Sequence, residues 1–153
     1  MYPDLPKQER KESLEKVLKL MEKGKNMILF PEVLTVLKTL KKSNLTLNIL
    51  SGNNQNFIKS FLKENNILPF FNSILTPDFL KTEKSNIFNY YINTQFEQTK
   101  ILHVGDDPEL DYHWPESLGL NTIWLKRENS RYSDESIPKN KTINSLSELS
   151  QLL

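Results

Sequence analysis

The segment that decides the fold runs from Lys100 to Leu125 and reads KILHVGDDPELDYHWPESLGLNTIWL. Its apolar run 101–104 predicts a buried strand, which ends at Gly105 and leads directly into two carboxylates, Asp106 and Asp107. In open parallel sheets, ligands bind beyond the carboxyl ends of the strands. The segment therefore predicts an acidic loop at the ligand-binding edge of such a sheet.

The second half of the segment predicts a helix and another strand. The helix begins near Pro115 and stops at Gly119, because glycine suits the left-handed position that follows a helix. The apolar run 122–125 is the next strand. A strand, a helical crossover and a second strand form a unit in which the two strands are parallel.

The acidic loop is a candidate metal site. Carboxylates that converge on one point repel each other unless a cation lies between them, and hard oxygen ligands favour Mg²⁺. We expect Asp106 and Asp111 to be the ligands, with Asp107 as a further candidate. The same spacing also suits an Asp-Pro turn whose acidic residues only cap the following helix, and the spacing alone does not separate these interpretations.

Composition excludes several classes of protein. The chain has 153 residues, is 37% hydrophobic and carries a net charge of +1 from 20 basic and 19 acidic residues that are interspersed. A nucleic-acid-binding protein would present a one-sided basic surface. Cysteine is absent, which rules out disulfides and cysteine-based zinc sites. No apolar run approaches the roughly 18 residues of a membrane span, and the N-terminus is too polar for a signal peptide. We expect a cytoplasmic protein that binds neither nucleic acid nor membrane.

The chain before the first α/β unit is strongly helical. Residues 7–23 carry one apolar stripe, which predicts packing on the parent domain or binding to a protein partner. We expect residues 1–25 to form an N-terminal helix and residues 26–153 to form the α/β core. After the apolar run 27–30, Pro31 begins a helix whose predicted inward side chains are Val33, Leu34, Leu37 and Leu40.

A second candidate site follows the predicted strand 45–50. Ser51, Gly52 and Asn53 lie at its carboxyl end and precede a helix over residues 55–64. Backbone N–H groups, the serine hydroxyl and the positive end of the helix dipole would together bind a phosphate. An ordinary helix cap is the alternative interpretation.

The remaining elements complete an alternation of strands and helices. Residues 73–75 predict a short edge strand, and a helix over 83–93 has Lys84 in its first turn. A cation there opposes the helix dipole, which indicates an anion nearby or else a solvated lysine. Residues 142–143 predict a last strand, and Ser145 caps a helix with Leu146, Leu149, Leu152 and Leu153 inward. We therefore predict a three-layer, doubly wound α/β fold with a mainly parallel sheet.

The order of these motifs resembles the haloacid dehalogenase (HAD) superfamily of phosphohydrolases over residues 30–153. The residues on which the resemblance rests are Ser51 after a strand, Lys84 at a helix start and the run His103-Val104-Gly105-Asp106, followed by Asp111 and Leu118-Gly119-Leu120. The resemblance implies that Ser51 binds the phosphoryl oxygens of a small phosphorylated molecule. It also implies that Lys84, or Lys81 as an alternative, neutralises developing charge. Asp106, supported by Asp111, would ligate Mg²⁺.

The chain departs from this family at the nucleophile. The family attacks phosphorus with an aspartate of a DxDxT motif, and this sequence has no such motif. Pro31 stands where that aspartate would follow the strand 27–30, so the core resembles one truncated at its N-terminus. The nucleophile's strand would lie at the centre of the sheet. Direct pairing of its neighbours or a strand from another chain could close the gap, but we expect residues 27–30 to fill it.

Two functions follow. The first is Mg²⁺-dependent hydrolysis of phosphoric monoesters, impaired because the nucleophile is missing. The second is a catalytically inactive domain that binds a phosphorylated ligand, or a protein partner through the helix over 7–23. The sequence leaves open whether the chain is an enzyme.

Overall fold

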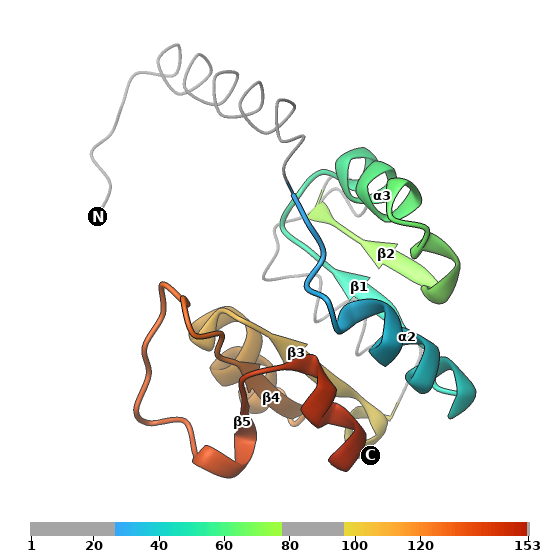
Figure 1. The fold of residues 1–153 in the computed structure, drawn as a ribbon. Coiled ribbons are helices and arrows are strands. Elements are labelled where there is room, and N and C mark those ends of the chain that lie inside the picture. Colours follow the sequence, from blue (N-terminus) through green and yellow to red (C-terminus); the bar gives the residue numbers. More distant parts are fainter. Residues whose placement is uncertain (1–26, 78–96, 153) are drawn as a thin grey trace. The chain divides into compact units, whose positions relative to one another are not determined.

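The computed structural model describes residues 27–77 and 97–152 (Figure 1). The predicted helix over 7–23 and both candidate lysines, Lys81 and Lys84, lie outside the described residues. The chain divides into two units, residues 1–30 and 31–153. The predicted boundary between residues 25 and 26 stays a prediction. Within the described ranges, no helix is long and apolar enough to cross a membrane.

The first sheet has two parallel strands and carries the serine loop. Strand β1, Asn48–Leu50, pairs with β2, Ser73–Leu75, with Leu50 opposite Leu75. Helix α3, Gln55–Glu64, follows β1 and packs against β2. The predicted helix over 55–64 and the short strand over 73–75 are confirmed.

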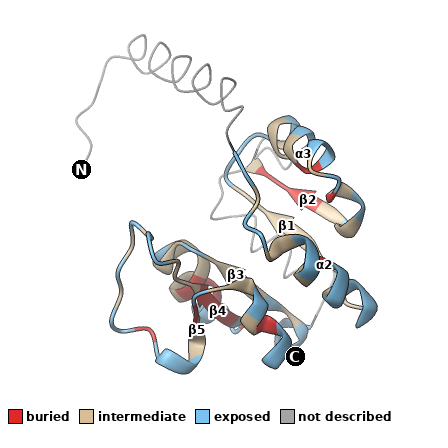
Figure 2. Ribbon diagram, viewed as in Figure 1, coloured by how far each residue is buried: buried red, intermediate tan, exposed pale blue. Residues whose placement is uncertain are grey.

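The second sheet has three parallel strands and carries the acidic loop. Its order is β3 (Leu102–Gly105), β4 (Asn121–Leu125) and β5 (Thr142–Ile143), so the longest strand lies in the centre. Figure 2 shows burial along β2 and β4, and Trp124 of β4 is only 1% exposed. The predicted α/β class with parallel strands is confirmed.

The expectation that residues 27–30 complete the sheet is wrong. They have no regular secondary structure, and among the described strands β1 pairs only with β2 whereas β3 pairs only with β4. Three of the four side chains are exposed, Ile28 by 86%. A short apolar run makes a strand only through its partners, and Pro31 cannot extend a ladder because it has no N–H group.

The crossover helix begins earlier than predicted. A π-helix, Pro108–His113, runs directly into helix α6, Trp114–Ser117, so Pro115 lies inside the helical segment rather than at its start. The cause is a cap: Asp107 Oδ1 accepts hydrogen bonds from the backbone N–H groups of Glu109 and Leu110 at 3.1 and 3.0 Å. The predicted stop is confirmed, because Gly119 has a φ of 81°.

Helix α2, Val33–Lys42, packs against the C-terminal 3₁₀ helix η5, Leu146–Gln151. Two of the predicted inward leucines instead face solvent: Leu34 is 41% exposed and Leu152 is 49% exposed. Leu152 follows a 3₁₀ helix, whose three-residue turn rotates its side chains away from the positions that an α-helix would give them. Leu34 lies on the rim of α2, whose buried residue is Leu37.

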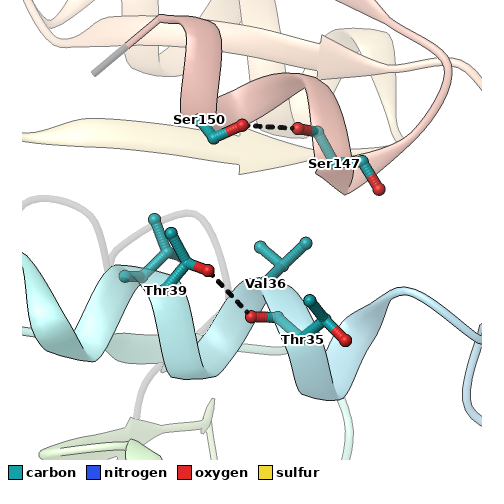
Figure 3. A pocket seen from close by; sticks show the side chains of 6 residues that line it. Thr35, Val36, Thr39, Ser147 and Ser150 are labelled. Carbon is teal, nitrogen blue, oxygen red and sulfur yellow. Dashed lines mark hydrogen bonds between the residues drawn. The ribbon is translucent and has the colours of Figure 1, made fainter.

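A cavity of about 160 Å³ separates α2 from η5 (Figure 3). Two of its hydroxyl groups donate to backbone carbonyls of their own helices, Thr39 to Thr35 and Ser150 to Ser147. These two hydroxyls are therefore satisfied within the helices. Its lining residues are Thr35, Val36, Thr39, Leu40, Ser147 and Ser150.

Candidate functional site

Asp106 lies at the carboxyl end of β3 with its side chain exposed to solvent. Its backbone carbonyl accepts a hydrogen bond of 2.9 Å from the indole N–H of Trp124, which is buried on the neighbouring strand. Within the described part of the chain, the Asp106 carboxylate has no hydrogen-bond or ion-pair partner. The backbone is thus fixed while the carboxylate stays free to bind a cation.

The Asp111 side chain connects the acidic loop to strand β3. Its Oδ1 is 3.3 Å from Nε2 of His103, and its Oδ2 accepts the Asp107 N–H at 3.1 Å. The Asp111 and His103 side chains are only 13% and 14% exposed. These bonds favour a supporting role for Asp111, which holds the backbone next to Asp106.

The absence of a side chain at Gly105 allows the Asp111 side chain to lie against the end of β3. A Cβ atom added there would overlap the Asp111 side chain. Real Cβ atoms essentially never come so close to another atom, and the Asp111 side chain cannot move away without breaking its bonds to His103 and Asp107. A glycine at the end of β3 is therefore required by packing, although its φ is not in the left-handed range.

Asp107 is engaged by its own helix. Its Oδ1 caps the π-helix by accepting two backbone N–H groups. The nearby Asp107 carboxylate, with burial, raises the pKa of Tyr132, because a neighbouring anion disfavours the phenolate. The interpretation of Asp107 as a helix cap is confirmed.

The donors in this loop suit Mg²⁺ in kind. Mg²⁺ is commonly bound through one or two carboxylates and keeps several water ligands. Asp106 supplies one exposed carboxylate on a bonded backbone, and Asp111 bonds to the N–H of the next residue. Among residues 27–77 and 97–152, however, no group of three or more His, Cys, Asp or Glu side chains converges as a complete metal site. Asp106 is thus the residue that would hold the ion, with other oxygen ligands still to be supplied.

The serine loop is anchored to β2 by one backbone bond at Ser51, and the exposed residues that follow make turn and cap bonds. Ser51 donates its N–H to the Leu75 carbonyl at 3.0 Å, and its Oγ accepts the Asn53 N–H at 3.2 Å. Asn54, rather than Ser51, caps α3, because its side chain accepts the N–H groups of Asn56 and Phe57. Gly52 and Asn53 are exposed. The predicted phosphate role of Ser51, Gly52 and Asn53 stays a prediction.

Thr76 is a feature of this edge that the sequence interpretation missed. It follows β2 directly, next to Leu75, whose carbonyl accepts the Ser51 N–H. Thr76 is 0% exposed, and its hydroxyl has no hydrogen-bond partner among the described residues. A threonine at the end of a short apolar run gives no sequence signal of this kind, because the missing partner is a property of the packed structure.

The structure brings together Asp106, Asp107 and Asp111, but not all of the predicted site. Ser51 lies on the first sheet and the acidic loop on the second, and within the described ranges no strand joins them. His103 and Trp124 are supporting residues that sequence reasoning did not assign. Their only signal was position: His103 precedes the loop on the same strand, and Trp124 lies opposite Gly105 on β4.

The family comparison agrees with this arrangement. Residues 2–125 match the sequence profile of the haloacid dehalogenase-like hydrolases. No protein with a curated description matches the chain in sequence.

Three similar solved structures share the fold. A HAD phosphatase from Thermococcus onnurineus has 21% identity and a TM-score of 0.71, covering 81% of this chain and 57% of its own. A Bacillus subtilis protein described as the HAD-hydrolase YfnB and bound to magnesium has 22% identity and a TM-score of 0.71, with coverages of 82% and 56%. A dehalogenase with an intermediate complex has 26% identity and a TM-score of 0.70, with coverages of 81% and 56%.

This chain thus spans little more than half the length of those three proteins. The first two likenesses concern the fold alone. The profile match extends over most of the sequence and includes the acidic loop. The chain therefore belongs to the haloacid dehalogenase-like hydrolases.

Proposed function

We propose that this chain carries the magnesium-binding and phosphate-binding parts of a phosphoric-monoester hydrolase and does not turn over substrate by itself. The observation that carries the proposal is Asp106, an exposed carboxylate on a backbone that Trp124 and the Asp111 network hold in place. The magnesium-bound Bacillus subtilis structure supports the choice of ion.

Each residue has a distinct part in this proposal. Asp106 would bind Mg²⁺, which when bound supplies positive charge against the phosphoryl oxygens. Ser51, with the N–H groups of Gly52 and Asn53, would donate hydrogen bonds to those oxygens at the end of β1. Lys84, or Lys81, would add a second positive charge. These groups stabilise charge in the transition state, but none of them replaces an attacking carboxylate.

The missing nucleophile favours a second candidate, a binding domain without hydrolytic activity. Such a domain would hold a small phosphorylated molecule through the same loops, or a protein partner through residues 7–23. The two candidates differ in one test: a separate segment bearing a DxDxT strand would restore turnover to the first and would leave the second inactive.

Hydrolysis of a panel of small phosphate esters, with and without Mg²⁺, tests the proposal. We expect no turnover, together with a melting temperature that Mg²⁺ raises in the wild type and leaves unchanged in Asp106→Asn. Glu109→Gln is the matched control, because it removes a nearby exposed carboxylate of the same segment that the proposal does not use. Turnover that needs both Mg²⁺ and Asp106 would contradict the claim that no nucleophile is present.

A further inference from the structure

Residues 126–141 connect β4 to β5 and end in a 3₁₀ turn, Lys139–Lys141. Ile137 of this segment is 5% exposed and forms one apolar cluster with Tyr112 of the π-helix and Trp124 of β4. Tyr132 packs against the same cluster. The segment is polar in sequence, and these two side chains supply its apolar contact with the cluster.

A polar anchor holds the same segment to the end of the π-helix. The Asp134 carboxylate lies 2.8 Å from Nε2 of His113, and its other oxygen accepts both the N–H and the hydroxyl of Ser136, at 2.9 and 2.6 Å. His113 and Asp134 side chains are 34% and 23% exposed. Since the Ser136 hydroxyl donates to Asp134 rather than to His113, the three residues are a structural clamp and not a nucleophile with its base.

The 126–141 segment therefore contacts the last two residues of the π-helix. Ile137 and Tyr132 pack in the cluster that contains Tyr112, and Asp134 bonds to His113. The same helix contains Asp111, whose Oδ2 accepts the Asp107 N–H immediately after Asp106. A shift of the helix would move Asp111 and with it the backbone of the loop.

We propose that the 126–141 segment sets the position of the Asp106 carboxylate, with Asp134 and Tyr132 as positioning residues that act through the π-helix. Neither residue would touch the ion. Loss of an outer partner of a metal ligand typically lowers metal affinity by about 10- to 100-fold. The proposal rests on the proposed function of Asp106 and adds to it a remote segment that tunes the affinity.

Calorimetric titration of the full chain with Mg²⁺ tests the proposal. We expect Asp134→Ala to weaken binding by roughly 10-fold, at the low end of that range. Glu135→Ala removes a neighbouring exposed acidic residue that does not hold the helix, and it should bind Mg²⁺ as the wild type does. Asp134→Asn keeps an acceptor for Ser136 and should recover most of the affinity. Equal affinity in Asp134→Ala and the wild type would overturn the proposal.

A second measurement separates this inference from the proposed function. Amide exchange at Asp107, followed by NMR without any metal, should be faster in Asp134→Ala and in His113→Phe than in Glu135→Ala. If the wild type shows no Asp106-dependent Mg²⁺ binding, the proposed function fails, while faster exchange would still support the clamp. Unchanged exchange in His113→Phe, which keeps an aromatic ring beside Tyr112 but removes the partner of Asp134, would overturn the clamp even if Asp134→Ala does not fold.

Discussion

The two candidate loops lie at the carboxyl ends of parallel strands, yet they are held in different ways. Three bonds hold the acidic loop after β3. His103 contacts the Asp111 carboxylate, Asp111 accepts the Asp107 N–H, and the indole N–H of Trp124 donates to the Asp106 carbonyl. The serine loop after β1 bonds to β2 through the backbone of Ser51, but Gly52 and Asn53 are exposed, and the bond of the Asn53 N–H is to the Ser51 hydroxyl of the same turn. Buried bonds fix a geometry before a ligand arrives, whereas exposed turn bonds compete with water. One half of the site is thus preorganised within this chain and the other is not.

Gly105→Ala should break the preorganised half and have the largest effect. The added methyl group overlaps the Asp111 side chain, which must leave its bonds to His103 and Asp107. We expect a loss of about 1–3 kcal/mol in the free energy of unfolding, as for other overpacked sites, together with loss of Mg²⁺ binding. Urea denaturation measures the first effect. Gly52→Ala is the control, since Gly52 is exposed and its φ is not in the left-handed range. A Gly105→Ala protein as stable as the control would contradict the account.

Asn54→Ala should destabilise the serine loop and helix α3 without changing the acidic loop. The side chain caps α3 through two backbone N–H groups, and loss of such a cap typically costs about 1 kcal/mol. The measurable result is a lower urea midpoint with Mg²⁺ binding unchanged, because the acidic loop lies on the other sheet. Weakened Mg²⁺ binding would instead mean that the two halves are coupled.

Thr76→Val should stabilise the protein, whereas the two preceding variants should destabilise it. Valine has nearly the shape of threonine, and the buried Thr76 hydroxyl has no partner among the described residues. Removing it should raise the free energy of unfolding by roughly 1 kcal/mol, because an unsatisfied buried polar group is costly. Ser73→Ala is a contrasting variant on the same strand, since the Ser73 hydroxyl donates to Asn48 and its loss should destabilise the protein. A Thr76→Val protein that is less stable than the wild type would show that the hydroxyl has a partner.

The smallest expected effect concerns pH. Hydrogen bonds from Ser136, with the His113 contact, lower the pKa of Asp134 from 3.8 to about 2. A carboxyl group with a lowered pKa in the folded state stabilises the fold above pH 4, and this contribution is lost as the pH falls towards 2. The stability difference between the wild type and Asp134→Asn should therefore shrink over that range in thermal melts. A difference that stays constant from pH 5 to pH 2 would contradict the assigned partners.

Much of the fold could be predicted from local patterns. The apolar runs of β3 and β4, the helix over 55–64 and the stop at Gly119 all follow from short-range rules that the structure confirms. Residues 27–30 have a similar apolar pattern but form no strand. Their failure has a physical reason, because strand formation depends on a pairing partner that the sequence of the segment does not specify.

The candidate site was predictable only in part. Asp106 and Asp111 follow from the spacing of the acidic loop, but the division of their roles does not. Asp111 is held by His103, eight positions earlier, at one oxygen and by the Asp107 N–H at the other. The contact of Asp134 with His113 spans a longer separation, of 21 positions, across a polar segment. Long-range contacts of this kind depend on the packing of whole elements, which no local motif encodes.

Native-state hydrogen exchange, measured residue by residue in the metal-free chain, tests the central claim most directly. The Asp107 and Asp111 amides, which bond within the buried network, should exchange at least about tenfold more slowly than the Asn53 amide, which bonds only to the nearby Ser51 hydroxyl. That result would mean that the chain itself preorganises the metal half of the site. Equal or faster exchange at Asp107 and Asp111 would contradict the account.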